Sequence, residues 1–218
     1  KKRLLSFGRM KKTDNIKDYK KKLSILEDAK KYIIKDGWSK NLFKNLLSDK
    51  IMRADLTYLF PNGYLDLLEA SLNELNKSLE NKVKKINIIN FPMSTRMKKI
   101  LFERLEILNK EKIFFRKTFN HLILPQNAKI MKKILYNSVD NMWYLAGDNS
   151  TDFSFYTKRL TLAAIYTNAL VIFFNKDVEQ AKINIERNLN KISHIPKLKK
   201  RFSFIKESLP IFLKGIFN

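Results

Sequence analysis

Residues 141–167 read NMWYLAGDNSTDFSFYTKRLTLAAIYT, and this stretch decides the fold. Apolar residues recur at helical spacing before Gly147 and after Asp152, and a short polar loop separates them. Gly147 suits the left-handed position just past a helix end, and the carboxylates of Asp148 and Asp152 suit the start of the next helix. The stretch therefore predicts one helix that ends near Ala146 and a second that begins near Asp152.

Helical patterns extend outward from this stretch in both directions. Between Tyr64 and Val83, leucines recur at spacings of three and four, and a capping pattern of Ser24 with Glu27 predicts the start of the first helix. The 218 residues include only 5 Gly and 5 Pro, too few for the many turns of an all-β fold. We therefore expect an all-α fold of about nine to ten helices that ends in a C-terminal amphipathic helix.

The composition excludes several classes of site. The chain has no Cys and only 2 His, which excludes disulfides, thiolate metal sites and cysteine catalysis and disfavours histidine-based metal sites. No cluster of acid, base and nucleophile stands out in the sequence. We therefore expect no catalytic residues, no metal and no enzymatic activity.

The formal net charge of +23 suits a nucleic acid or an anionic membrane as partner. The lysines, however, are scattered along the whole chain, in a sequence rich in Ile and Asn, as an AT-rich genome produces at permissive surface positions. The charge therefore permits nucleic acid as a partner but does not make it the expected one.

Five aromatic residues lie close to the loop of the quoted stretch: Trp143, Tyr144, Phe153, Phe155 and Tyr156. Two helices with opposed faces cannot bury all five, so some of these side chains are expected to be exposed. Exposed aromatic side chains are typical of binding surfaces. The loop and its aromatic residues thus predict an interaction surface.

The same stretch closely resembles the ubiquinone-biosynthesis accessory proteins, a family of lipid-binding, TetR-like proteins that assist the demethoxyubiquinone hydroxylase. The resemblance is carried by Met142-Trp143, Ala146-Gly147-Asp148, Ser150-Thr151-Asp152-Phe153, Tyr156-Thr157, Arg159 and Leu162-Ala163-Ala164-Ile165-Tyr166, with Leu124-Pro125 and Asn127 upstream. It is strong over residues 121–175 and looser, in the order of the helices, over residues 24–218. One departure is Ser154-Phe155, where the family usually has Asn-Trp.

The resemblance implies a TetR-like helical fold, commonly dimeric, with an apolar cavity large enough to shelter a terpenoid chain. A bound isoprenoid or phospholipid is expected rather than a cofactor. The candidate lipid-binding residues are Leu135, Met142, Leu162, Ile165 and Phe173. Their spacing alone leaves open that each of them is ordinary core.

The resemblance also implies a docking surface for the hydroxylase, with candidate residues Trp143, Asp152, Phe155, Tyr156 and Arg159. Phe155 replaces the Trp of the family's docking patch, which keeps an apolar anchor but removes the indole donor. Arg159 has an alternative role as the internal ion-pair partner of Asp148 or Asp152.

Residues 197–218 combine an apolar stripe with basic flanks, as an interfacial helix does. The stripe consists of Phe202, Ile205, Leu209, Phe212, Leu213 and Ile216. The family resembled also ends in an amphipathic helix that contacts membrane, so membrane lipids are an expected partner. The alternative is a terminal helix that folds back on the core or on a dimer mate.

Four parts are expected along the chain. They are a basic arm or transit-peptide remnant over residues 1–23, a helix-turn-helix-like subdomain over 24–84, a helical lipid-binding core over 85–196, and the amphipathic helix over 197–218. We expect a peripheral membrane protein on the matrix side of the mitochondrial inner membrane, or on the cytoplasmic membrane face of a bacterium.

The expected function is that of a non-enzymatic accessory protein, which presents a polyisoprenoid quinone precursor to the hydroxylase at the membrane. Two alternatives stay open: a structural subunit of a larger mitochondrial assembly derived from this family, and a TetR-like DNA-binding regulator. The recognition helix expected for a regulator, Asp49 to Phe60, is near neutral and mostly apolar, which argues against base readout.

Overall fold

The computed structural model describes residues 16–48, 51–150 and 153–193, and within these ranges the chain is helical and contains no strand. The helices are α1 (Ile16–Asp36), α2 (Leu42–Ser48), α3 (Arg53–Leu59), α4 (Tyr64–Lys84), α5 (Met93–Lys110), α6 (Lys112–Leu122), α7 (Ala128–Leu145), α8 (Phe153–Asn175) and α9 (Val178–Ser193), with 3₁₀ turns η1 (Ile88–Asn90) and η2 (Pro125–Asn127). The expected all-α class is confirmed, whereas its TetR-like character stays a prediction.

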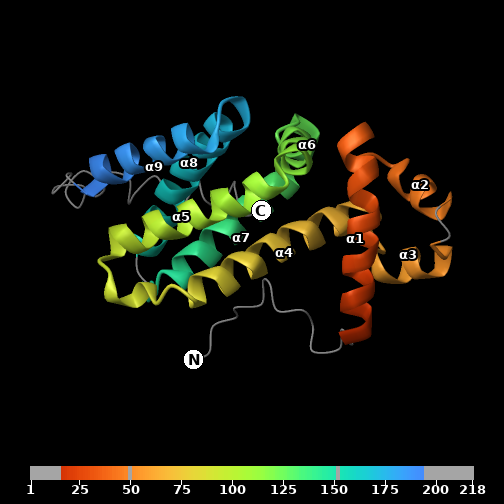
Figure 1. Cartoon of the computed structure of the whole chain (residues 1–218), viewed down its shortest axis with the longest axis horizontal. Helices are drawn as coiled ribbons and strands as arrows, with labels where there is room; N and C mark the ends of the chain where they lie inside the picture. The colour runs from red at the N-terminus through yellow and green to blue at the C-terminus, as the bar shows by residue number, and fades with distance from the viewer. Residues whose placement is uncertain (1–15, 49–50, 151–152, 194–218) are drawn as a thin grey trace.

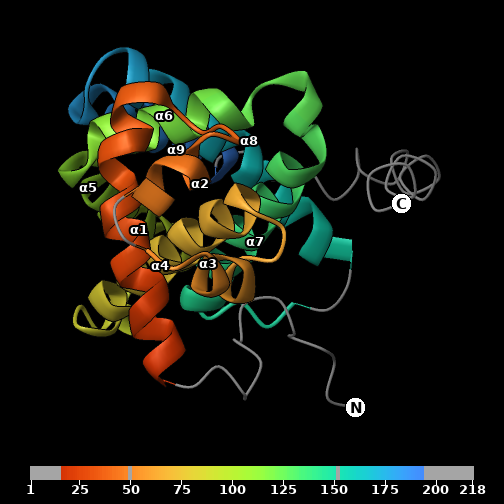
Figure 2. The same ribbon diagram turned by 90° about the vertical axis from the view of Figure 1, so that its right-hand side faces the viewer.

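One long helix, α4, runs between two groups of helices (Figure 1). At one end the short helices α2 and α3 lie beside α1, and α1 also packs on α4 and α6. At the other end α5 lies along α4 and contacts α7 and α9, while α8 and α9 form an outer pair. Figure 2 looks along the molecule from the α1–α3 end, with α4 behind these helices.

A buried tryptophan ties the first group of helices to α6. Trp38 is only 6% exposed, and its indole Nε1 donates to Oγ1 of Thr118 over 3.0 Å. The same ring lies 6.1 Å from the ring of Phe114, centroid to centroid. Because a buried indole N–H needs an acceptor, this bond fixes how α1 meets α6.

The predicted start of the first helix is wrong. Helix α1 begins at Ile16, so Ser24 is an exposed residue in its interior and not a cap. The extra turns make tertiary contacts, since Tyr19 donates to a carboxylate oxygen of Glu74 in α4, and Lys21 pairs with Asp55 in α3 at 2.7 Å. These contacts extend the helix past a local capping pattern that the sequence also offers.

Other helix ends lie where the sequence places them. Gly37 follows α1 with a φ of +77°, and Gly147 follows α7 with a φ of +81°, as expected for glycines that end a helix. Helix α4 begins at Tyr64 as predicted and buries Leu68, Leu75 and Leu79. Helical periodicity was thus a sound guide to this part of the core.

Candidate functional site

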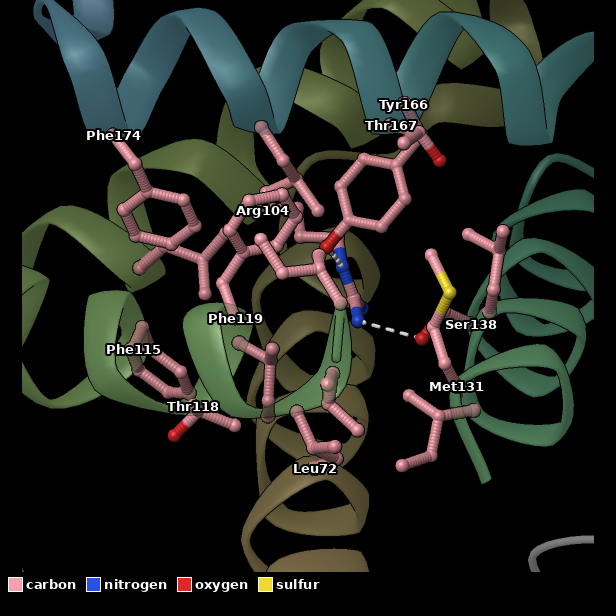
Figure 3. Close-up of a pocket in the computed structure, with 17 residues that line it drawn as sticks. Leu72, Arg104, Phe115, Thr118, Phe119, Met131, Ser138, Tyr166, Thr167 and Phe174 are labelled. Atoms are coloured by element: carbon pink, nitrogen blue, oxygen red, sulfur yellow. Dashed lines mark hydrogen bonds between the residues drawn. The ribbon is translucent and has the colours of Figure 1, made fainter. Parts of the chain in front are cut away.

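An apolar pocket lies between α4, α5, α6, α7 and α8 (Figure 3). Most of its wall is aliphatic or aromatic, and two of its polar members, Ser138 and Tyr166, gather around Arg104. The apolar wall is made by Leu72, Leu75, Leu108, Phe115, Phe119, Leu122, Ile123, Met131, Ile134, Leu135, Leu170 and Phe174. The composition of this wall suits the apolar part of a small ligand.

The candidate lipid-binding residues are divided between this wall and the solid core. Leu135 lines the pocket. Met142, Leu162, Ile165 and Phe173 are not among its lining residues; they are at most 6% exposed and belong to the buried core. For these four residues the alternative interpretation as ordinary core is the one that matches their positions.

The pocket is much smaller than expected. Its volume is about 70 Å³, roughly that of two water molecules at about 30 Å³ each. As it stands this pocket is too small for a terpenoid chain, so the expected cavity stays a prediction. A larger groove of about 460 Å³ lies between α1, α4, α5 and α6. Its lining is mixed, since the charged side chains of Glu27, Lys30, Glu74, Lys82 and Glu111 stand beside Leu26, Leu75, Ile107, Phe114 and Phe115.

The polar end of the apolar pocket is built on Arg104, which the sequence analysis did not single out. This residue of α5 is 1% exposed. Its Nε donates to the hydroxyl of Tyr166 at 2.6 Å, and its terminal nitrogens donate to Oδ1 of Asn76 at 2.8 Å and to Oγ of Ser138 at 3.0 Å. A signal was present in the sequence, because Arg104 interrupts the apolar stripe formed by Met97, Leu101 and Leu108.

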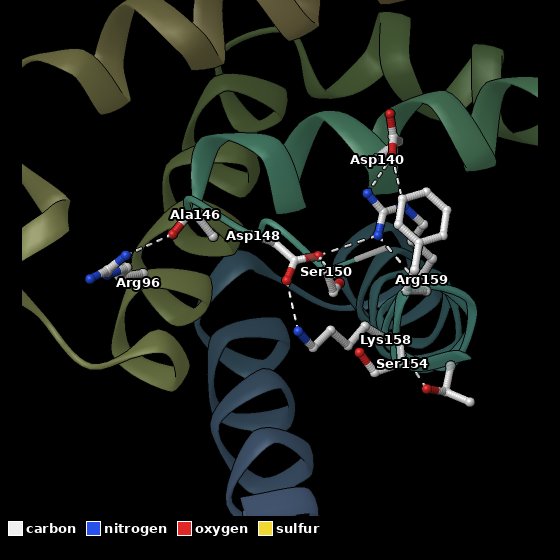
Figure 4. Close-up of polar contacts among 10 residues, drawn as sticks. Arg96, Asp140, Ala146, Asp148, Ser150, Ser154, Lys158 and Arg159 are labelled. Atoms are coloured by element: carbon white, nitrogen blue, oxygen red, sulfur yellow. Dashed lines mark hydrogen bonds and ion pairs between the residues drawn. The ribbon is translucent and has the colours of Figure 1, made fainter. Parts of the chain in front are cut away.

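The loop after α7 forms a compact corner around Gly147 (Figure 4). Gly147 N–H donates to the carbonyl of Tyr144, and Asp148 N–H donates to the carbonyl of Trp143, which is the Schellman pattern of helix ends. The guanidinium of Arg96 donates to the carbonyl of Ala146 at 3.0 Å. The carbonyls of Trp143, Tyr144 and Ala146 at the end of α7 are therefore satisfied.

A network of ions closes this corner onto α8. The Asp148 side chain is 3% exposed, and its carboxylate accepts from Lys158 Nζ at 2.7 Å and from Ser150 Oγ at 2.7 Å. Arg159 lies 3.4 Å from Asp148 and 2.6 Å from Asp140. The alternative role predicted for Arg159, an ion pair with Asp148, is therefore confirmed, and Asp140 is a second partner that was not predicted.

The electrostatics of Asp148 follow from these contacts. Burial alone raises the pKa of its carboxyl, but hydrogen bonds from Lys158 and Ser150 favour the charged form, and the resulting pKa lies below its usual value. Asp148 is therefore an ionised structural group at neutral pH.

The aromatic residues around the loop divide as expected between surface and interior. Tyr144 is 64% exposed and Tyr156 is 42% exposed, while Trp143 and Phe155 are half-buried. Lys158 Nζ lies 5.5 Å from the centre of the Trp143 ring, and the guanidinium carbon of Arg159 lies 3.3 Å from that of Phe155. These cations order the half-buried rings, and among these four aromatic side chains the two tyrosines are the most exposed.

Of the candidate docking residues, Trp143 thus lies at the end of α7, and Phe155 and Tyr156 lie at the start of α8. Arg159 is only 8% exposed and faces inward, so its guanidinium supports the corner from within. Asp152 lies outside the described residues. The docking role of all five stays a prediction.

The candidate membrane residues Phe202, Ile205, Leu209, Phe212, Leu213 and Ile216 also lie outside the described residues. Within the described ranges, no helix combines the length and the apolar character needed to cross a bilayer.

The helix that a DNA-binding regulator would use to read bases is α3. In it Asp55 is paired with Lys21, and Tyr58 is 72% exposed.

Comparison with known proteins agrees with the resemblance read from the sequence. Residues 128–195 match the family model described as COQ9. The chain is similar to the ubiquinone biosynthesis protein COQ9 of Rattus norvegicus, with 47% identity over 51 residues, 23% of this chain and 16% of the relative. It is also similar to the Homo sapiens protein of that name, with 34% identity over 97 residues, 43% of this chain and 30% of the relative.

A more distant match is more extensive. The ubiquinone biosynthesis protein coq9 of Schizosaccharomyces pombe is 26% identical over 179 residues, 80% of this chain and 68% of the relative. By contrast, the chain spans less than a third of the rat and human relatives. The family match includes α7 and α8, which hold the corner and part of the pocket wall. Residues 128–195 are thus the part of this chain that is similar to the COQ9 family.

Proposed function

We propose that this chain acts in ubiquinone biosynthesis as a non-enzymatic, lipid-binding accessory protein. The similar proteins of rat, human and Dictyostelium discoideum all carry the name ubiquinone biosynthesis protein and the word mitochondrial, which supports this role and a mitochondrial location. The finer location, on the matrix side of the inner membrane, is part of the proposal.

The observation that carries the lipid-binding proposal is the apolar pocket with a polar end. Its wall supplies aliphatic and aromatic surface from α4, α6, α7 and α8, and Arg104, Ser138 and Tyr166 supply polar groups at one place. An amphiphile has the same division between tail and head. Each methylene that leaves water for such a wall contributes about 0.8 kcal/mol.

The small volume of the pocket requires that it widen when a long tail enters. Side chains that line it from α6 and α7, such as Phe119, Met131 and Ile134, are half-buried, and Ile123 just after α6 is 51% exposed. We place the entry between these two helices, because fewer contacts hold their side chains than hold those of the buried wall. A ligand that binds the wider form more tightly shifts the protein toward it.

The second part of the proposal is that the corner around Gly147 docks the demethoxyubiquinone hydroxylase. Tyr156 supplies an exposed aromatic contact, and Trp143 and Phe155 support it from the same surface. The ion network of Asp148 and Arg159 positions these aromatic groups without contacting the partner. A homodimer and a membrane contact through residues 197–218 belong to the same proposal.

Lipid extraction tests the central claim. Purified protein, washed with detergent-free buffer and extracted with organic solvent, is expected to release about one isoprenoid or phospholipid molecule per chain by mass spectrometry. The control is a Leu135→Arg variant, which places a charge on the pocket wall and should release much less lipid while keeping its helical circular dichroism. Wild-type protein that releases no lipid, under conditions where a known carrier retains its own, would contradict the proposal.

A second candidate is a structural subunit of a larger mitochondrial assembly. The volume of only about 70 Å³ favours it, since a scaffold needs no space for a tail. This alternative predicts lipid-free protein that migrates in a stable complex of high mass when isolated from its source. Lipid in the extract together with the free chain in solution contradicts it.

A further inference from the structure

The side chain of Arg104 places a positive charge inside the apolar pocket. Figure 3 shows its guanidinium between Tyr166 and Ser138, with the apolar wall around it. Arg104 is 1% exposed, Ser138 is 2% exposed and Tyr166 is 4% exposed, so this polar cluster is closed off from solvent. Arginine side chains are almost never buried to this degree unless a carboxylate or another anion is beside them.

No carboxylate accompanies this charge in the described part of the chain. The two acids nearest to Arg104 in the sequence are engaged elsewhere, since Glu103 pairs with Lys82 at 2.7 Å and Glu106 pairs with Lys182 at 2.6 Å. All three hydrogen-bond partners of Arg104 are neutral groups, two hydroxyls and one amide oxygen. They solvate the guanidinium but do not neutralise it.

The guanidinium also keeps donors in reserve. Arginine has five N–H groups, and the bonds to Tyr166, Asn76 and Ser138 use one on Nε and one on each terminal nitrogen. Each terminal nitrogen therefore has a second N–H that none of these bonds uses. Two N–H donors on a planar cation match the two oxygens of a carboxylate, the group that arginine binds best in pairs.

The pocket is ordered from a charged interior to an apolar mouth. Arg104 lies at the closed end, whereas Ile123 on the same wall is 51% exposed. A ligand that satisfies both ends must enter with its polar head first and leave its tail along the wall. The volume of about 70 Å³ favours a compact head over the bulky head group of a phospholipid.

We propose that this pocket selects single-chain amphiphiles with a carboxylate head, and that Arg104 is the residue that recognises the head. This inference rests on the proposed lipid-binding function and adds to it the chemistry of the head and the direction of entry. Ser138 and Tyr166 are positioning residues, since they hold the guanidinium in place.

Two probes with the same tail test the proposal. Oleate and oleyl alcohol share one hydrocarbon chain and differ in the charge of the head, and their binding is measured by displacement of the neutral dye Nile red, at 0.15 M salt and below the concentration at which either probe aggregates. We expect wild-type protein to bind oleate at least about tenfold more tightly than oleyl alcohol, because hydrogen bonds between charged groups are about twice as strong as neutral ones.

Two variants assign this preference to one residue. Arg104→Gln should bind both probes with affinities within about threefold of each other, since the charge and most of the N–H donors are lost from the site. Lys98→Gln, on the same helix but 40% exposed and paired with Glu186, is the matched control and should keep the full preference for oleate. The Lys98→Gln variant loses only a surface cation, and its attraction for the oleate head is already screened by the salt.

The outcomes separate head-group selection by Arg104 from lipid binding in general. Equal binding of both probes to wild-type protein refutes head-group selection while lipid binding stands. Failure of both probes to bind also refutes head-group selection, and the lipid extraction described above then decides whether the proposed function stands. A preference that survives in Arg104→Gln refutes the role of Arg104. If that variant does not fold, as judged by circular dichroism, Tyr166→Phe and Ser138→Ala replace it, and an undiminished preference in both refutes the assignment.

Discussion

Replacing Gly147 by alanine tests whether the corner after α7 depends on one glycine. Gly147 has a φ of +81°, and a Cβ there lies 3.2 Å from Nη1 of Arg96 and 3.6 Å from Cδ1 of Ile89. Arg96 holds the corner together, because it donates to the carbonyl oxygens of Ala146, Phe91 and Ile89. The added methyl group therefore strains the backbone and displaces the guanidinium.

The magnitude follows from these two effects. Left-handed backbone costs an alanine about 1–2 kcal/mol, and the reduced freedom of the unfolded chain offsets about 0.4–1 kcal/mol of this. Weakening one hydrogen bond from a charged donor costs about 1.5–3 kcal/mol, which we discount to about 1 kcal/mol because Arg96 is half-exposed and screened by water. We expect Gly147→Ala to lower the free energy of unfolding by about 2 kcal/mol.

The chain contains a matched control for the backbone strain. Gly37 has a φ of +77°, but a Cβ there meets nothing within 4 Å, so Gly37→Ala should cost only about 1 kcal/mol. Urea unfolding followed by circular dichroism at 222 nm measures both values. In an Arg96→Ala background the extra loss from Gly147→Ala should disappear, because the displaced group is absent.

Two results would refute this reasoning. If Gly147→Ala and Gly37→Ala lower the free energy of unfolding equally, the contact with Arg96 contributes nothing measurable. If the extra loss persists in the Arg96→Ala background, another contact at the corner is responsible. Either result shows that the shape of this loop does not depend on the guanidinium.

Three further predictions concern charge and docking. Because the folded-state pKa of Asp148 is below its usual value, its contribution to stability is complete well above the usual carboxyl pKa of about 3.9 and is lost as the pH falls through the folded pKa. Asp148→Asn should thus cost about 2 kcal/mol at pH 7, and this cost should shrink as the pH is lowered, in urea titrations. Burial lowers the pKa of His121, so unfolding should become easier as the pH drops below about 6.5, and His121→Phe should reduce this slope between pH 7 and pH 5. Tyr156→Ala should weaken binding of the hydroxylase at least about tenfold in a surface plasmon resonance titration, whereas Tyr58→Ala, at a 72% exposed site in α3, should not change it.

Much of the fold could be predicted from sequence because helix periodicity and glycine chemistry act locally. The leucine spacing from Tyr64 onward and the glycine at position 147 each depend on a few neighbouring residues. The start of α1 could not be predicted in this way, since Tyr19 and Lys21 are stabilised by contacts with Glu74 and other residues that are distant in sequence.

The pocket was harder to predict than the corner. Periodicity showed that Met142 and Phe173 point inward, but whether an inward side chain meets a neighbour or a space depends on how five helices meet. Arg104 was not predicted, because helical periodicity is read from the apolar residues of a helix face and leaves out a charged residue on the same face. The turn at Gly147 and the ion pair of Asp148 with Arg159 could be predicted because these residues lie close together in the chain, whereas the contact of Arg96 with Ala146, 50 residues away, was not predicted.

The two tryptophans give this protein two built-in fluorescent reporters. The chain contains only Trp38 and Trp143; the first donates to Thr118 of α6, and the second lies beneath the ammonium of Lys158. A Trp143→Phe variant therefore emits only from the junction of α1 with α6, and a Trp38→Phe variant only from the corner. Loosening of the first group of helices and arrival of a partner at the corner become separately visible, without any attached dye.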